Sequence, residues 1–379
     1  MKPALSLFVL LAATFAAAQV QQITIAAGTP EDQFLQSVSA EKDQQKRTAL
    51  LQEFMQKFSA NPHAVAYGNS QLSQLYQDAG DNAKALEYGD KALAAQPNNL
   101  DLAIAQVGIA QKIKANDKPL DYAVRGAAAY QSIARQPKPD GMSDEQFAAK
   151  VHQEQEQFRA SYEYLEASAF NVVASEQDSK QRMNEIERYT AAFPDSRFQE
   201  KLLQLAVYTL GQLKDSARLG SFADKALAAS PDGLSTLVVL AAAFVELPDP
   251  ASITRAEGYA RKGMDLAKAQ AASDPAKSKQ YGGLAQSVLG YALLKEEKIP
   301  AAIVELKGAT AELKDNPEGY AAALFRLGYA YGKSKRIPEA KAALTEVASI
   351  SGPYQQPAKD MLAQIEKAPA KPAAARAHK

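Results

Sequence analysis

The sequence contains internal repeats, and these restrict its fold more than any other feature does. The residues DKALAAQP at 90–97 recur as DKALAASP at 224–231, about four periods of 34 residues further on. Near the C-terminus, LGYA at 289–292 recurs at 327–330. Repeats of this kind specify one small structural unit several times over, and such units bury their apolar faces by stacking on each other. We therefore expect a stacked array, which also suits a length of 379 residues, above the size of most single cores.

The segments within the repeats have the composition and periodicity of helices. Ala, Leu, Gln, Glu and Lys, which are all good helix formers, are abundant in them. Apolar residues fall three and four positions apart, as Leu72, Leu75 and Tyr76 do. Clusters of Gly, Asp, Asn and Pro interrupt this pattern about every 12 to 20 residues, as is typical of helix ends. Because strand patterns are nearly missing, the sequence predicts an all-α fold of antiparallel helix pairs joined by short turns.

The repeats place the same residue types at the same positions, and in this they resemble the tetratricopeptide repeat family. The family pattern has Leu-Gly on the first helix of a pair, an aromatic or bulky residue three positions later, and Ala on the second helix. The last full repeat has Leu327, Gly328, Tyr331 and Ala340 at these positions. In the first clear repeat, Ser73 stands where this pattern has Gly. The best repeats are 66–99, 200–233, 283–317 and 321–354.

The resemblance implies antiparallel helix pairs stacked into a right-handed superhelical solenoid over residues 31–366. The stretch 116–196 matches the pattern poorly, and two interpretations are open. It consists of degenerate repeats with longer helices, or it joins an N-terminal to a C-terminal superhelix. Within it, Ser143 and Gln146 are spaced as a capping pair, which predicts the start of a long helix over about 144–174.

The two ends of the chain differ from the middle. Residues 1–18 have one early Lys, an apolar run and a closing Ala-Ala-Ala, which is the pattern of a secretory signal peptide cleaved after Ala18. The alternative is an uncleaved membrane anchor, but the run is shorter than the roughly 20 residues that span a bilayer. A polar linker, 19–30, follows. Residues 367–379 are Ala, Pro and basic residues, which predicts a disordered tail. We therefore expect an exported protein, periplasmic or secreted, of bacterial type.

The composition argues against several functions. There is no Cys, so disulfides, thiol nucleophiles and Cys-bound metals are excluded, and there are three His, none near another in sequence. Lys and Arg balance Asp and Glu at 43 each, so no field favours nucleic acid. No catalytic or nucleotide-binding motif is present. We expect no cofactor, no metal and no enzymatic activity. The apolar segment 234–247 is too short to span a membrane and is expected to be a buried helix.

A stacked helical array offers an extended concave surface, and the resemblance implies that the first helix of each pair lines it. Tyr, Phe, Gln and Lys on those helices suit recognition of proteins or peptides. The paired Lys and Asn with which some family members hold a C-terminal carboxylate are missing, since Ser70 and Gln74 stand there. The residues expected on this face are Tyr67, Ser70, Gln74, Gln77, Ser287, Tyr291, Lys295, Phe325, Tyr329 and Lys333. For Tyr291 and Tyr329, packing between helices is an equal alternative.

Three functions are compatible with these features. The first is a non-catalytic scaffold or adaptor that binds other proteins in a bacterial periplasm or cell envelope. The second is a protein that binds envelope or cell-wall polysaccharide by stacking sugars on exposed rings, against which the lack of Trp counts. The third is a hydrolase built on a helical solenoid, which requires a buried Glu with a raised pKa in a pocket.

Overall fold

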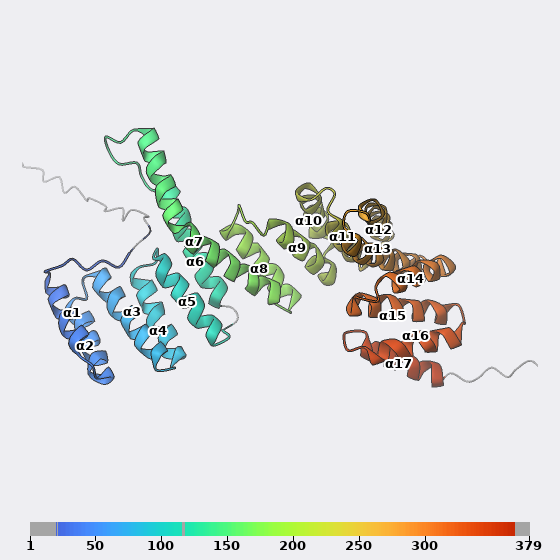
Figure 1. Cartoon of the computed structure of the whole chain (residues 1–379), viewed down its shortest axis with the longest axis horizontal. Coiled ribbons are helices and arrows are strands. Elements are labelled where there is room, and N and C mark those ends of the chain that lie inside the picture. Colours follow the sequence, from blue (N-terminus) through green and yellow to red (C-terminus); the bar gives the residue numbers. More distant parts are fainter. Residues whose placement is uncertain (1–19, 21, 116–117, 368–379) are drawn as a thin grey trace, which may run out of the picture. The chain divides into compact units, whose positions relative to one another are not determined.

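The computed structural model describes residues 20, 22–115 and 118–367, and within these ranges it is helical without a strand (Figure 1). Within each of its parts, most consecutive helices pack against each other as antiparallel neighbours. The predicted all-α solenoid of helix pairs is therefore confirmed. The predicted signal peptide, 1–18, lies outside the described residues, as does the predicted tail apart from Lys367, which ends the last helix.

The chain divides into two compact units. The N-terminal unit comprises residues up to 177 together with 184–196, and the C-terminal unit comprises 178–183 and the chain from 197 onward. The division falls in the stretch that matches the repeat pattern poorly. The helices of the N-terminal unit are α1 (Pro30–Ala40), α2 (Gln44–Lys57), α3 (Pro62–Asp78), α4 (Asn82–Ala95), α5 (Leu100–Lys112), α6 (Lys118–Ser132) and α7 (Asp144–Ser175), with most of α8 (Ser179–Ala192).

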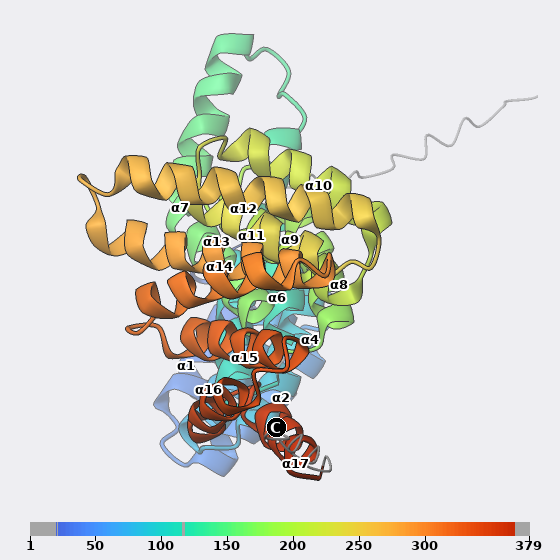
Figure 2. The ribbon, with the colours of Figure 1, turned by 90° about the vertical axis from the view of Figure 1, so that its right-hand side faces the viewer.

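The C-terminal unit is a regular succession of helices, and Figure 2 shows α12 to α17 following one another in chain order. Its helices are α9 (Gln199–Leu213), α10 (Ser216–Ala229), α11 (Leu234–Val245), α12 (Pro250–Gln270), α13 (Pro275–Lys295), α14 (Ile299–Glu312), α15 (Pro317–Lys333), α16 (Ile337–Ser349) and α17 (Gln355–Lys367). The apolar segment 234–247 forms α11, which packs against α9, α12 and α13 and is largely buried, as expected. Among the described residues, no helix combines the length and apolar character needed to cross a membrane.

Polar caps fix where many of these helices begin. An Asp or Asn side chain before the first turn accepts a hydrogen bond from a free backbone N–H, which stabilises a helix start by about 1 kcal/mol. Such caps are Asp43, Asn61, Asp81, Asn99, Asp215, Asp249, Asp274 and Asn316. At the start of α7, Ser143 and Gln146 form the reciprocal pair that the sequence predicts. Local sequence therefore determines where many of these helices start.

The Gly of the Leu-Gly pattern lies where the two helices of a pair meet. A Cβ added at Gly328 of α15 would lie 2.9 Å from Leu344 Cγ of α16, and one added at Gly290 of α13 would lie 2.6 Å from Leu306 Cγ of α14. Both distances are too short for a real contact, so Gly permits this approach without a shift of the facing leucine. In the first clear repeat, Ser73 donates a hydrogen bond to Ala85 O at 2.7 Å, across the same helix pair. There a polar contact replaces the glycine contact.

Candidate functional site

The ten residues predicted to line a concave face fall into two groups. Tyr67, Ser70, Gln74 and Gln77 lie on α3 of the N-terminal unit, and the other six lie on α13 and α15 of the C-terminal unit. Five of those six, at positions 291, 295, 325, 329 and 333, line one hollow between α13 and α15. The sequence pattern therefore brings together the residues of the C-terminal group, and they form the candidate site.

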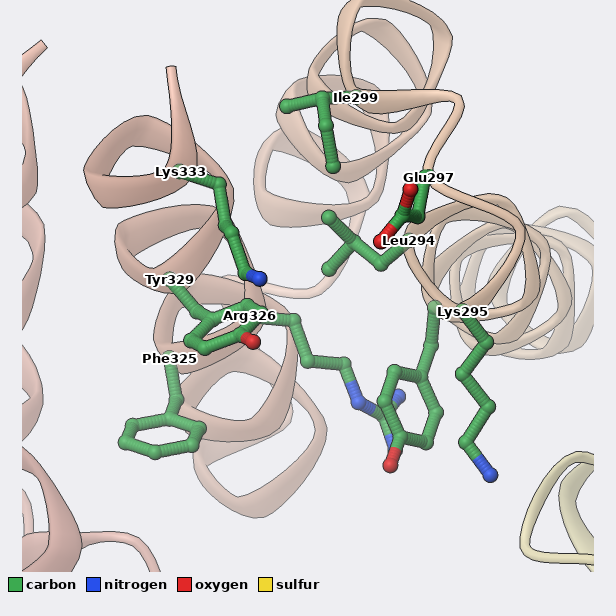
Figure 3. A pocket seen from close by; sticks show the side chains of 9 residues that line it. Leu294, Lys295, Glu297, Ile299, Phe325, Arg326, Tyr329 and Lys333 are labelled. Carbon is green, nitrogen blue, oxygen red and sulfur yellow. The ribbon is translucent and has the colours of Figure 1, made fainter. Parts of the chain in front are cut away.

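This hollow, which we call the tyrosine groove, has a volume of about 650 Å³. Its lining combines aromatic rings with positive charges from two helices (Figure 3). The lining residues are Tyr291, Leu294, Lys295, Glu297, Ile299, Phe325, Arg326, Tyr329 and Lys333. Each helix contributes a tyrosine and a lysine four residues later, and residues four apart share one face of a helix. This spacing is why both pairs reach the same hollow.

Three cations lie close to the tyrosine rings. Lys295 Nζ is 5.3 Å from the centre of the Tyr291 ring, and Lys333 Nζ is 5.7 Å from the centre of the Tyr329 ring. From α15, Arg326 extends toward α13 (Figure 3), and its Cζ lies 4.5 Å from the Tyr291 ring centre. Cation–ring contacts of this kind contribute about 0.5–1 kcal/mol each at exposed sites. They hold the positive charges at the groove surface.

A second hollow of about 550 Å³, which we call the inner groove, shares Arg326 with the tyrosine groove. Its lining comes from α9, α11, α13 and α15, which are first helices of successive pairs, and from the loop after α16. The lining residues are Tyr208, Gly211, Gln212, Lys214, Val238, Ala242, Ala243, Glu246, Leu284, Ser287, Val288, Asn316, Glu318, Gly319, Ala322, Arg326 and Tyr354. The two grooves thus meet at one arginine and run along the C-terminal unit.

Ser287 has a different place from the one its sequence position suggests. Its side chain lines the inner groove but is only 2% exposed. Its hydroxyl oxygen accepts a hydrogen bond from Arg326 Nη1 at 3.0 Å. An arginine that a buried hydroxyl already holds in place loses less conformational entropy when a ligand binds than a free arginine would. Ser287 therefore positions Arg326.

Lys295 is the most constrained cation of the site. Its ammonium group donates to the carbonyl oxygen of Leu247 at 3.4 Å and, more closely, to that of Val245. Both carbonyls lie at the C-terminal end of α11, where a helix favours positive charge. Burial, the largest influence, lowers the pKa of Lys295 below the ordinary lysine value, and burial also raises the pKa of Tyr291. Lys295 thus links α13 to α11 as well as lining the groove.

The lysines of the two Tyr–Lys pairs should therefore differ in their effect on stability. We expect Lys295→Met to lower the free energy of unfolding by about 1 kcal/mol, because it removes a cation from the end of α11 and leaves two carbonyls with one partner fewer. Lys333 is exposed and lies over the Tyr329 ring, so Lys333→Met should change stability by less than about 0.5 kcal/mol. Urea unfolding of both variants measures the difference. Equal effects would contradict the helix-end role of Lys295.

The α3 group does not line either groove. Tyr67 packs against the apolar cluster of α1 to α3, with its ring centre 6.3 Å from that of Phe54. Ser70 donates to Tyr67 O within its own helix, and Gln74 donates to Asp78 Oδ1. Gln77 is half-buried near the end of the helix, and its carbonyl accepts from Gly80 N. These contacts account for the α3 residues as parts of the helix and its packing.

Sequence reasoning missed the residue that joins the two grooves. The predicted residues on α15 are four positions apart, at 325, 329 and 333. Arg326 lies three residues before Tyr329 and so falls outside this series, although it is on an adjacent part of the same helix surface. Tyr208 and Tyr354 were also missed, because Tyr208 is on α9 in a less regular repeat and Tyr354 follows the last predicted groove helix. No cluster of His, Asp or Glu able to hold a metal ion occurs in the described part of the chain.

Comparison with known proteins gives structural but not sequence matches. No family model matches the sequence, and no curated protein matches it. The tetratricopeptide domain of P58(IPK) is similar in structure at 11% identity and a TM-score of 0.25, with 89% of this chain and 98% of that chain covered. A chain of the APC/C hetero-tetramer Cut9–Hcn1 is similar at 12% identity and a TM-score of 0.22, with 89% and 90% covered.

The helix pairs and the small residues packed within them identify the type of fold. Antiparallel helix pairs recur along it, and the Gly of the Leu-Gly pattern occupies the close contact within the pairs of α13–α14 and α15–α16. The small Ala expected on each second helix is fully buried at Ala85, Ala302 and Ala340. The chain is a tetratricopeptide-like helical repeat protein.

Proposed function

We propose that the chain is an exported scaffold of a bacterial periplasm or cell envelope, and that it binds an extended segment of a partner protein along the two grooves of its C-terminal unit. Arg326 carries this proposal. Among the described residues no carboxylate lies within ion-pair distance of it, although it is half-buried where both grooves meet. A half-buried guanidinium already positioned by Ser287 and Tyr291 is suited to pair with an acidic group of a ligand.

The rest of the lining supports a protein ligand. Tyr and Arg are the residues that most often dominate the affinity of protein interfaces. The grooves combine them with apolar surface from Leu294, Val238 and Val288, which suits the alternating side chains of an extended segment. We infer that the segment carries at least one acidic side chain near apolar or aromatic ones. The carboxylates that line the grooves, Glu246, Glu297 and Glu318, are half-buried or exposed, so neither groove presents the buried acid of a hydrolase.

One observation favours polysaccharide as a second candidate ligand. Tyr208 in the inner groove and Tyr329 in the tyrosine groove are 46% and 41% exposed. Exposed rings are the surfaces on which sugars stack. The proposed experiment therefore has to separate protein from glycan ligands.

The experiment is capture from envelope extract with the chain from residue 19 onward, followed by mass spectrometry and carbohydrate analysis. A captured protein is cut into fragments, and the binding of each fragment is measured by calorimetry. We expect Arg326→Gln and Tyr329→Ser each to weaken fragment binding about tenfold or more, since residues at the centre of an interface contribute about 2 kcal/mol. Tyr164→Ser is the matched control, because Tyr164 is 42% exposed on α7 of the N-terminal unit and lines neither groove.

The outcomes are distinct. Fragment binding that is unchanged in both groove variants would overturn the proposal. Glycan captured in place of protein, and lost in Tyr329→Ser, would establish the second candidate. The cellular location is tested separately by fractionation and N-terminal sequencing, for which we expect a mature chain that begins at Gln19.

A further inference from the structure

The segment 22–29, which precedes α1, lies against the first helices of the N-terminal unit at a junction around His63 of α3. The backbone N–H of Thr24 donates to His63 Nδ1 at 3.2 Å, and the Thr24 hydroxyl lies 3.4 Å from the same atom. The next residue, Ile25, packs against the apolar cluster that includes Leu35, Leu51 and Phe54. One polar contact and one apolar contact thus hold this segment in place.

Neighbouring hydrogen bonds determine which form of the His63 ring this junction accepts. Leu102 N donates to Asn99 Oδ1 at 3.0 Å, so the other end of the Asn99 amide is its NH₂ group, which donates to Gln96 Oε1 at 3.0 Å. The NH₂ group of Gln96 therefore faces His63 Nδ1, at 2.9 Å. With Thr24 N–H, two N–H donors point at Nδ1, so in this arrangement the atom is an acceptor, and the Thr24 hydroxyl can donate to it as well.

Acid would reverse this arrangement, because a protonated imidazole carries a proton on both ring nitrogens. The two donors cannot easily turn away. Thr24 N–H belongs to the backbone, and Gln96 and Asn99 are 1% and 3% exposed. His63 also lies in the first turn of α3, where the helix dipole disfavours positive charge.

The charged surroundings of His63 do not compensate for a positive ring. Its described side-chain contacts, on the N-terminal segment and at the end of α4, are with Thr24 and Gln96, and both are uncharged. Its backbone N–H donates to Asn61 Oδ1 in its own helix. The carboxylate that enters this network is Glu31 of α1, which accepts from Asn61 Nδ2 at 3.2 Å and so is already engaged.

We propose that neutral His63 is an acid-sensitive latch, which holds segment 22–29 on the N-terminal helices near neutral pH and releases it when the ring is protonated. Because two N–H donors face Nδ1 in the docked arrangement, acid favours the undocked segment, and docking weakens as the pH falls. Release would withdraw Ile25 from its cluster and expose part of the apolar surface of α1 to α3. The chain would then gain an apolar surface in acid that it lacks at neutral pH.

Hydrogen exchange of the full chain tests the latch. We expect the protection factor of the Thr24 amide, corrected for the intrinsic effect of pH, to fall as the pH is lowered, by at most about tenfold for each unit of pH, since one proton is taken up on release. Amides within α3 and α4 should keep their protection over the same range, which separates release of the segment from unfolding. At neutral pH, ring ¹⁵N shifts should show His63 protonated at Nε2 alone.

Two variants make the test specific. In His63→Asn the amide oxygen occupies the place of Nδ1 and cannot be protonated there, so the Thr24 amide should stay protected in acid. His152→Asn is the control, because His152 is an exposed residue on α7 whose side chain is 76% accessible, and this variant should behave as the parent chain does. Loss of Thr24 protection in acid that persists in His63→Asn, or protection in the parent that does not change with pH, would overturn the latch.

Discussion

Replacing Phe54 by Ala is expected to lower the free energy of unfolding of the first helices by about 3–5 kcal/mol, the cost of removing a large ring from a closed core. The Phe54 side chain is fully buried at the centre of the apolar cluster of α1 to α3. Its ring centre lies 5.2 Å from that of Phe58 and 5.8 Å from that of Phe34.

The loss should be local, because each repeat of a stacked array is stabilised mainly by its neighbours. Hydrogen exchange should therefore show α1, α2 and α3 opening first, while the amides of the C-terminal unit keep the rates of the parent chain. Val304→Ala provides the comparison, since Val304 is 66% exposed on α14 and its truncation should change stability by less than about 0.5 kcal/mol. Unchanged exchange in α1 to α3 of the Phe54 variant would show that this cluster contributes little.

Features that depend on short sequence distances could be predicted. The capping pair of Ser143 and Gln146 lies within one helical turn, so its residue types and spacing are sufficient to place it. The two Tyr–Lys pairs of the tyrosine groove also lie one turn apart, at 291 and 295 and at 329 and 333. The all-α fold follows from many such local patterns that agree with each other.

Features that depend on how neighbouring helices meet could not be predicted. Ser287 and Tyr67 fit the helical spacing of a concave face, yet one is buried under Arg326 and the other packs against Phe54. Arg326 joins the two grooves because its side chain reaches the ring of Tyr291 on another helix. His63 likewise gains its contacts from residues 39 positions before it and 33 positions after it. Contacts between residues so far apart in the sequence depend on how the helices pack against each other, and the spacing of residues along one helix does not reveal them.

Packing between helices also underlies the second large prediction, which concerns two Leu-Gly pairs of the C-terminal unit. Gly211 follows Leu210 on α9, and Gly220 follows Leu219 on α10. A Cβ added at Gly211 would lie 2.7 Å from the Cα and 3.1 Å from the carbonyl oxygen of Ala243 on α11. These atoms belong to the backbone, so they can move away only if the two helices separate.

We therefore expect Gly211→Ala to lower the free energy of unfolding by about 1–3 kcal/mol, as overpacking does where no side chain can give way. Urea unfolding monitored by circular dichroism measures this change, and a lower midpoint with an unchanged slope would identify it as a loss of stability. Because Gly211 and Ala243 also line the inner groove, separation of α9 and α11 should weaken binding of a captured fragment as well.

Gly220→Ala is the matched control, and its effect should have the opposite sign. A Cβ at Gly220 would meet no atom within 4 Å. Alanine there only restricts the unfolded chain and favours the helix, which should raise stability by about 0.5–1 kcal/mol. Glycine after leucine would then be required for helix packing on α9, whereas on α10 its replacement by alanine would stabilise the fold. If both variants changed stability in the same direction and by similar amounts, the close approach of α9 and α11 would not be the reason for glycine at 211.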